Sequence, residues 1–526
     1  MDALRDPATG HPLFGDARFR SATFHGSACF EWATFQGDAR FQWAIFQGDA
    51  VFGGAAFQGG ARFGAVAFHD DAVFETATFR GDAVFRKAAF QRSARFGAVT
   101  FHGDAEFETV TFHGDAGFFV ATFQDGARFG GATFHRDAEF AAATFHNSAR
   151  FVGTVFERAA DLGPFSCAGQ VMLSGAVFGG PANLSFAARG LECRRTRWSS
   201  TAEVRLRYAT VDFAHAVFEY PLTIAAEADP FVLPEGQPVA EQALGHAPDA
   251  TVRISSLRGV DAAHLVLADV DLSECLFTGT VHLDQLQMEG TCSFRTVPPG
   301  THWRRWRLVR FTQRSTLAEE HHWRARQAAA VPGWNAAASG TGQHVGPAQL
   351  SPVYRALRKG FEDSKNEPGA ADFYYGEMEM RRHDRTGTTR AERGLLHSYW
   401  LLSGYGLRAS RALGWLVASM LITIVLLMGF GLPQDAPKQE ATGIVPPGGG
   451  KVTFEIDKND PQNPTSTRFT GKRLEKSLNI TFNSVVFRSS GQDLTTAGTY
   501  IEMASRVTEP ILLGFAVLAV CNRVKR

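Results

Sequence analysis

The sequence has little cysteine, no excess of either charge and none of the short motifs of common enzymes. Its six cysteines are scattered and form no CxxC pair, which excludes a disulfide framework and a structural zinc site. The 53 basic and 53 acidic residues balance, so the whole chain has no basic nucleic-acid-binding signature. It contains no Gly-rich phosphate loop, no GxSxG and no kinase motif set. We therefore predict a non-enzymatic protein with no catalytic residue, no cofactor and no metal ligand.

Phenylalanine, in contrast, is abundant and periodic. The chain has 45 Phe, and between Phe14 and Phe156 they recur in steps of five and six residues, which makes an 11-residue unit. A small residue, nearly always Ala, lies two positions before each Phe. Residues two apart share one face of a strand but not of a helix, and the Gly-Asp and Gly-Ser pairs that close most units would break helices. The repeat therefore predicts short strands rather than an 11-residue coiled coil.

Such short strands bury a face only when they wind into a coil whose turns stack and pair. The residue before each Phe tests the length of that coil. One set of alternate units is rich in Arg and the other is not; the sets are Arg18, Arg40, Arg62, Val84, Glu106, Arg128 and Arg150 against Cys29, Val51, Val73, Arg95, Gly117 and Glu139. Different compositions indicate different faces, as a 22-residue coil requires.

The unit, for example Asp38-Ala-Arg-Phe-Gln, resembles the pentapeptide repeat, whose consensus is Ala-(Asp/Asn)-(Leu/Phe)-x-x. The resemblance is strong over residues 14–156 and weaker over 160–290, and the departure is one extra residue in alternate units. It implies a right-handed quadrilateral β-helix with the third residue of each unit in the core. We expect a mainly β chain, with a regular β-helix at 14–160 and a degenerate continuation with loop insertions at 161–297.

Two rows of outward-facing side chains are candidate surfaces on this β-helix. One row comprises Arg18, Arg40, Arg62, Arg128 and Arg150. This row would either bind an anionic partner or form a solvated face whose charge is offset by Asp residues in the turns. We favour the solvated face. The other alternates His and Gln, which favours a hydrogen-bonding position over a ladder of metal ligands. Some pentapeptide-repeat proteins imitate DNA and bind a topoisomerase, but the small acidic excess of residues 1–160 supports that function weakly.

The composition changes after Pro299, where Arg, Trp and Glu become frequent. We expect a helix at 301–329, a flexible linker at 330–350 and a helical hairpin connector at 351–400. The string Glu319-Glu-His-His322 lacks HExxH spacing, so we place it on an exposed helix face. Asp372-Phe-Tyr-Tyr-Gly-Glu-Met-Glu-Met-Arg381 resembles the linker of membrane-attached pentapeptide-repeat proteins, in which a channel-like hairpin follows.

Residues 405–526 are expected to form a two-helix membrane domain. Residues 412–433 carry no charge and are long enough to span a bilayer, and residues 497–521 form the second span or a re-entrant helix. The second helix has a polar stripe, Glu502, Arg506 and Glu509, which implies a helix partner and a homo-oligomer. Basic residues flank both helices, which predicts cytoplasmic termini, an external loop at 434–495 and a bacterial inner-membrane location. The N-terminus has no apolar segment typical of a cleaved secretory signal.

This domain resembles a two-span cation-channel hairpin. Its candidate pore segment is Thr495, Thr496, Ala497, Gly498 and Thr499, which keeps one Gly but lacks the Gly-Tyr-Gly of a potassium filter. We therefore favour a non-conducting descendant of that hairpin.

The sequence as a whole favours a membrane-anchored scaffold whose cytoplasmic β-helix docks a protein partner. Alternatives are an oligomeric ion-channel-like protein gated through the repeats and a DNA-mimicking topoisomerase-binding protein. The expected partners are the lipid bilayer, a cytoplasmic protein and further copies of the chain. Neither a small-molecule substrate nor a nucleic acid is expected.

Overall fold

The computed structural model describes residues 10–233, 236–245, 249–304, 307–327, 332–334, 345–434, 439–444, 447–448, 450–451, 455–458, 461–462, 468–489 and 491–524. Within the predicted linker, residues 330–331 and 335–344 lie outside the described residues. The chain divides into two compact units, Met1–Tyr374 and Tyr375–Arg526, and each is described by itself.

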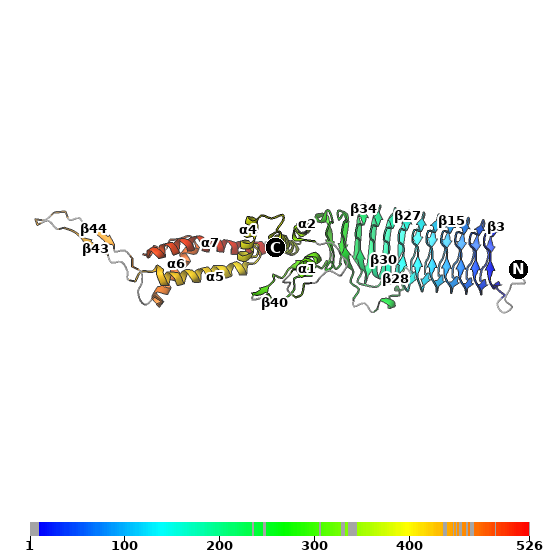
Figure 1. The fold of residues 1–526 in the computed structure, drawn as a ribbon, viewed down its shortest axis with the longest axis horizontal. Helices are drawn as coiled ribbons and strands as arrows, with labels where there is room; N and C mark the ends of the chain where they lie inside the picture. The colour runs from blue at the N-terminus through cyan, green and yellow to red at the C-terminus, as the bar shows by residue number, and fades with distance from the viewer. Residues whose placement is uncertain are drawn as a thin grey trace. The chain divides into compact units, whose positions relative to one another are not determined.

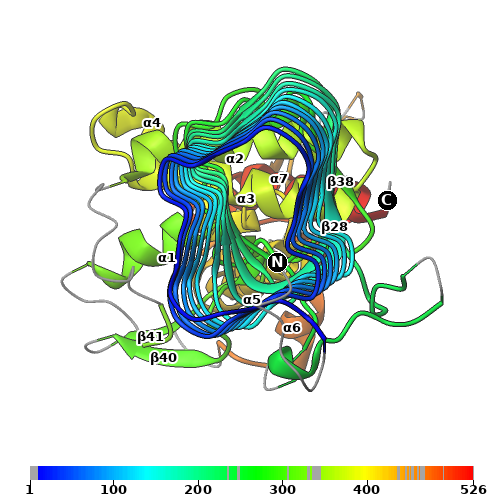
Figure 2. The same cartoon turned by 90° about the vertical axis from the view of Figure 1, so that its right-hand side faces the viewer.

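The first unit contains a β-solenoid of about 12 turns, drawn from blue to green in Figure 1. In its regular part, from β1 (Leu13–Phe14) to β27 (Val155–Phe156), each strand has two residues. Ladders run in parallel between strands one turn apart: β2 (Ala17–Arg18) pairs with β6 (Ala39–Arg40), and β6 with β10 (Ala61–Arg62). These partners are 22 residues apart and the turn has four sides (Figure 2), so the predicted 22-residue coil is confirmed.

Phenylalanine fills the inside of every turn in the regular part of the solenoid. Phe85, Phe96 and Phe107 are fully buried, as are the Ala residues two positions before most Phe. Rings in one column stack with the turn above, as Phe85 and Phe107 do with centroids 4.8 Å apart. Rings from opposite sides meet edge to face, as Phe96 and Phe107 do at 5.2 Å and 86°. Both geometries are favourable for aromatic pairs, and each buried Phe contributes roughly 1.5–3 kcal/mol of apolar burial.

The coil shortens from 22 to 20 residues within β28 (Ala160–Met172). Ala160 pairs with Ala182, Phe165 with Phe186 and Val171 with Leu191, so the separation falls by one residue at each of two register shifts. The next turn keeps the shorter length, because Phe178 pairs with Trp198. Four sides of five residues make 20, so this stretch has lost the extra residues of the 11-residue unit.

The later strands are longer and less regular. They are β29 (Val177–Phe178), β30 (Ala182–Glu192), β31 (Arg197–Trp198), β32 (Ala202–Arg207), β33 (Thr210–Asp212), β34 (Val217–Phe218), β35 (Leu222–Ala226), β36 (Arg253–Ser256), β37 (Leu265–Ala268) and β38 (Gln287–Glu289). Thr210 pairs with Arg253 and Leu222 with Leu265, 43 residues on in each case, so a long insertion leaves the coil between β35 and β36. Both features explain why the repeat is hard to follow in the sequence here.

The prediction of one helix at 301–329 is wrong. β40 (Thr301–Arg304) and β41 (Arg307–Arg310) form an antiparallel pair, and β39 (Arg295–Thr296) pairs with β42 (Ser315–Thr316). Only α1 (Ala318–Ala325) is an α-helix in the described part of this stretch. Short segments mixing β-branched or aromatic residues with Arg satisfy either pattern, and pairing between them decides the outcome.

Helices cover the last turns of the solenoid. α2 (Pro347–Asp363) and α3 (Glu367–His383) bring Phe361 and Phe373 against Phe294, with ring centroids 6.0 and 5.0 Å apart. The Lys359 ammonium lies 2.7 Å from the Asp284 carboxylate. A final turn has no further coil to pack against, so an apolar helical cover removes it from water.

The second unit is mainly helical. Its elements are α4 (Arg390–Ser403), α5 (Ala409–Leu426) continued by the π-helical η4 (Leu427–Gly431), β43 (Gln439–Thr442), β44 (Glu455–Lys458), α6 (Gly471–Val485) and α7 (Thr496–Val524). The helical runs Ala409–Gly431 and Thr496–Cys521 are long and apolar enough to cross a membrane. Helix α6 lies inside residues 434–495, for which the sequence predicts an external loop.

Candidate functional site

The five predicted Arg residues of the solenoid lie on one face. Arg18, Arg40 and Arg62 are Cα partners in successive turns, and Arg128 pairs in the same way with Arg150. The ladder is not uniformly basic, because Val84 and Glu106 separate the two groups of Arg.

Acidic residues neutralise much of this face. The Arg40 guanidinium lies 3.0 Å from the Asp38 carboxylate, and its hydrogen bond holds the pKa of Asp38 below the usual range. Arg128 lies 2.8 Å from Asp104 and 3.2 Å from Glu106. Among the described residues, Arg62 and Arg150 make no ion pair. Free positive charge on this face is therefore local rather than continuous.

The His and Gln row forms side-chain ladders between turns. His25 Nδ1 and Gln47 Oε1 are 2.8 Å apart, and the rings of His113 and His135 stack with centroids 4.7 Å apart. His135 Nδ1 lies 2.7 Å from Glu157. Across the described part of the chain no group of three His, Cys, Asp or Glu is placed to hold a metal ion.

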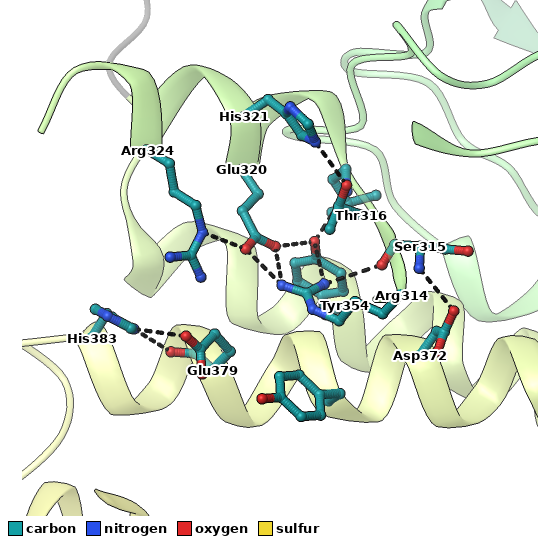
Figure 3. Close-up of polar contacts among 12 residues, drawn as sticks. Arg314, Ser315, Thr316, Glu320, His321, Arg324, Tyr354, Asp372, Glu379 and His383 are labelled. Atoms are coloured by element: carbon teal, nitrogen blue, oxygen red, sulfur yellow. Dashed lines mark hydrogen bonds and ion pairs between the residues drawn. The ribbon is translucent and has the colours of Figure 1, made fainter. Parts of the chain in front are cut away.

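A buried ion network lies on α1, contrary to the predicted exposed helix face. Glu319, Glu320 and His321 are at most 2% exposed. Figure 3 shows the Glu320 carboxylate between Arg314, 2.6 and 2.7 Å away, and Arg324, 2.7 Å away. Burial alone would raise the pKa of Glu320, but the two guanidinium groups outweigh it and lower the pKa to about 2.

The network joins α1 to α2 and to the solenoid. The Tyr354 hydroxyl of α2 donates to Glu320 at 2.5 Å, and Glu319 accepts the backbone N–H groups of Phe277 and Thr278 at 2.5 and 3.0 Å. His321 Nε2 lies 2.9 Å from the Thr316 hydroxyl, and burial lowers the pKa of His321 to about 4. Glu319 Oε2 and His321 Nδ1 are buried without a hydrogen-bond partner among the described residues, but both Glu320 oxygens are paired. The network is central to the cover, so we assign it a structural role.

The surfaces of α5 and α7 are strongly apolar. Leu421, Ile422 and Val425 of α5 are 54–61% exposed, and Val507 and Leu518 of α7 are 59% and 57% exposed. A core helix of a soluble protein would bury such side chains, whereas only 33% and 28% of the most apolar windows of the two helices are buried. This band needs an apolar surrounding.

Two residues of the predicted polar stripe of α7 contact different neighbours, α5 and the segment after α6. Glu509 is fully buried and accepts a hydrogen bond of 2.9 Å from Thr423 of α5. The second oxygen of Glu509 has no hydrogen-bond partner within the described residues. Arg506 donates to the Phe487 carbonyl after α6, at 3.4 Å, and Glu502 is partly buried.

The candidate pore segment is helical rather than extended. Thr495 caps α7, because its hydroxyl accepts the Gly498 N–H at 3.1 Å and donates to the Phe430 carbonyl at 2.6 Å. Thr496, Ala497, Gly498 and Thr499 form the first turn of α7. These residues therefore present no row of free carbonyls of the kind a potassium filter uses.

No sequence pattern points to Arg473 of α6, although this residue organises one end of the helix pair. Its guanidinium donates to the carbonyls of Met428, Leu432 and Pro433 at 2.8–2.9 Å. These carbonyls lie in η4 or directly after it, where no further helical turn supplies N–H donors, so the cation satisfies them. A basic residue 40 positions away gives no local signal of this contact.

Comparison with known proteins supports the repeat and nothing beyond it. Residues 19–67, 74–121 and 99–144 match the family model of pentapeptide repeats (9 copies). No curated protein and no solved structure matches the chain. The matched solenoid is a structural repeat fold.

Proposed function

We propose that the chain is a non-enzymatic, membrane-anchored scaffold. Helices α5 and α7 hold it in a bilayer, and the solenoid docks a protein partner. The observation that carries the proposal is the band of exposed apolar side chains along two helices, each long enough to cross the hydrocarbon core.

The basic flanks of the helix pair support a cytoplasmic position for the solenoid. Arg408 and Arg411 precede the apolar part of α5, and Arg523 follows that of α7. Because basic residues are retained on the cytoplasmic side, both ends of the pair lie there. The proposal includes right-handed winding of the coils and a helical hairpin connector at 351–400.

The solenoid suits an acidic protein segment as its partner. Its stacked Phe core keeps the outward rows at fixed spacing, and Arg62 and Arg150 have no ion-pair partner among the described residues. Such arginines bind carboxylates without first breaking an existing pair.

Deletion of residues 405–526 tests the anchor. The full chain should stay in the membrane pellet after alkaline carbonate washing, while the shortened chain should be recovered in the supernatant. A shortened chain that still pellets with carbonate-washed membranes would refute the anchoring role of α5 and α7. A matched deletion in the solenoid, residues 80–101, removes one 22-residue turn and should leave the full anchor in the pellet.

The position of α6 supports a second candidate, an oligomeric channel-like protein. Helix α6 packs against both α5 and α7, as a short helix inserted in a two-span hairpin would. The native mass of the detergent-extracted protein tests this function. A tetramer supports a central pore, and a monomer contradicts it.

A further inference from the structure

A basic hollow lies between the end of α3 and the start of α4. Its volume is about 560 Å³, and it is lined by Arg382, His383, Arg385, Arg393, Gly394 and His397. Three arginines and two histidines thus line one space, with no carboxylate among the lining residues. This composition indicates an anion as the ligand.

Arg382 is held in place from two sides. Its guanidinium lies 2.7 Å from the Glu379 carboxylate and 4.4 Å from the centre of the Trp400 ring. It also donates to His397 Nδ1 at 3.3 Å, so the proton of neutral His397 is on Nε2 and is available as a donor. The Arg382 side chain is 13% exposed, and its Nε–H is buried with no acceptor among the described residues. Arg382 therefore adds a fixed positive charge at the wall of the hollow.

Arg385 and Arg393 keep the hollow positive. Asp384 is the nearest acidic neighbour in sequence, but it already accepts from Thr386 and from the Gly387 N–H. Burial raises the pKa of Asp384, but these hydrogen bonds and the Arg393 charge outweigh burial and lower the pKa overall. Asp384 is not among the residues that line the hollow. Arg385 is exposed and makes no ion pair within the described residues.

The hollow lies beside the start of the proposed membrane anchor. Helix α4 leads into α5 within six residues, and Arg411 of α5 donates to the Trp400 carbonyl at 2.9 Å. Helix α4 also exposes Leu395 and Leu401. Apolar side chains next to basic ones are typical of a helix at the headgroup level of a membrane.

We propose that this hollow binds the phosphate of an anionic phospholipid headgroup. The inference rests on the proposed membrane anchoring, because it places the hollow at the bilayer surface. Arg385 and Arg393 offer planar forks that match phosphate oxygens, and Arg382 adds a fixed positive charge beside them. A lipid held here would fix the cytoplasmic end of α5 to one leaflet.

The test measures lipid retention by native mass spectrometry on the detergent-extracted full chain. Phosphatidylglycerol should be retained over phosphatidylcholine, and the double variant Arg385→Gln/Arg393→Gln should bind it at least about tenfold more weakly. The control Arg390→Gln/Arg488→Gln removes the same charge from exposed positions outside the hollow and should leave binding unchanged. Unchanged melting temperatures would show that both variants are folded.

Competition with inorganic phosphate distinguishes a lipid headgroup from free phosphate as the ligand of the hollow. Displacement of phosphatidylglycerol by millimolar phosphate supports an anion site, and binding of phosphate without any lipid preference would assign the site to a free phosphate and overturn the lipid proposal. Equal lipid retention by the wild type and the hollow variant would also overturn it. The carbonate-wash result is independent, so a hollow that fails this test leaves the anchoring proposal standing.

Discussion

Gly431 and Gly498 meet where η4 ends and α7 begins. A Cβ atom added to Gly498 would lie 2.8 Å from the Gly431 Cα and 2.9 Å from its carbonyl carbon. The Gly431 carbonyl also accepts the Thr495 N–H at 3.0 Å. Absence of a side chain at position 498 therefore allows the two helix ends to touch through their backbones.

This contact predicts that Gly498→Ala destabilises the second unit. The new methyl group meets backbone, which has no rotamer to change, so we expect a loss of about 1–3 kcal/mol. Gly514→Ala on the same helix is the control, because nothing lies within 4 Å of its added Cβ. Thermal unfolding in detergent measures both, and equal melting temperatures would contradict the close approach.

Two neighbouring phenylalanines test the inside and outside of the coil. Phe118 is fully buried and Phe119 is 40% exposed. Phe118→Ala opens a cavity in the aromatic column and should cost about 3–5 kcal/mol, whereas Phe119→Ala should change stability by less than about 0.5 kcal/mol. Urea unfolding followed by circular dichroism gives both values. A larger loss for Phe119 would reverse the assigned faces.

Backbone strain at one turn predicts a stabilising substitution. Val120 has φ +56°, a left-handed conformation that a β-branched residue rarely adopts, and its side chain is 41% exposed. Val120→Gly should therefore raise the free energy of unfolding by up to about 1 kcal/mol. This gain is the backbone strain that is relieved minus the extra conformational entropy that glycine loses on folding. The equivalent turn position 131 is already Gly, with φ +63°. Gly131→Val should lower stability, and a stabilising effect there would contradict the argument.

The buried His321 makes the helical cover sensitive to mild acid. Its pKa is about 4 in the folded chain against 6.5 for a free histidine, so the unfolded state binds the proton first as the pH falls. The stability that neutral His321 contributes is fully present above pH 6.5 and is lost as the pH falls from 6.5 to 4. By pH 5 the free energy of unfolding should have fallen by about 2 kcal/mol.

His321→Gln keeps a hydrogen-bonding group beside Thr316 and removes the titration. Its unfolding free energy should change less between pH 7 and pH 5 than that of the wild type. Burial lowers the pKa of His322 as well, so some pH dependence should remain. Identical pH dependence of the two chains would show that His321 is not the group responsible.

The regular solenoid could be predicted because its signals are local and repeated. Ala and Phe two residues apart define the strand face, and the separate compositions at the positions of Arg40 and Val51 reveal the 22-residue coil. The change to 20 residues depends on two single-residue register shifts inside β28, which leave no repeated signal.

The helical cover and the second unit were harder to predict because their contacts are distant in sequence. Burial of Glu320 requires Arg314 and Tyr354, and Tyr354 lies 34 residues away. Thr495 resembled part of a filter segment, but its contact with Phe430, 65 residues earlier, makes it a helix cap. Arg473 caps η4 by the same kind of distant contact.

Accessibility of spin labels in reconstituted vesicles tests membrane insertion most directly. A label at Leu421→Cys or Val507→Cys, in a chain whose native thiols at Cys29, Cys292 and Cys521 are replaced by Ser, should relax strongly with oxygen and weakly with a water-soluble nickel chelate. A label at His25→Cys on the solenoid should show the opposite order. Strong relaxation of the Leu421 and Val507 labels by the nickel chelate would mean that α5 and α7 face water, and the scaffold would have no membrane anchor.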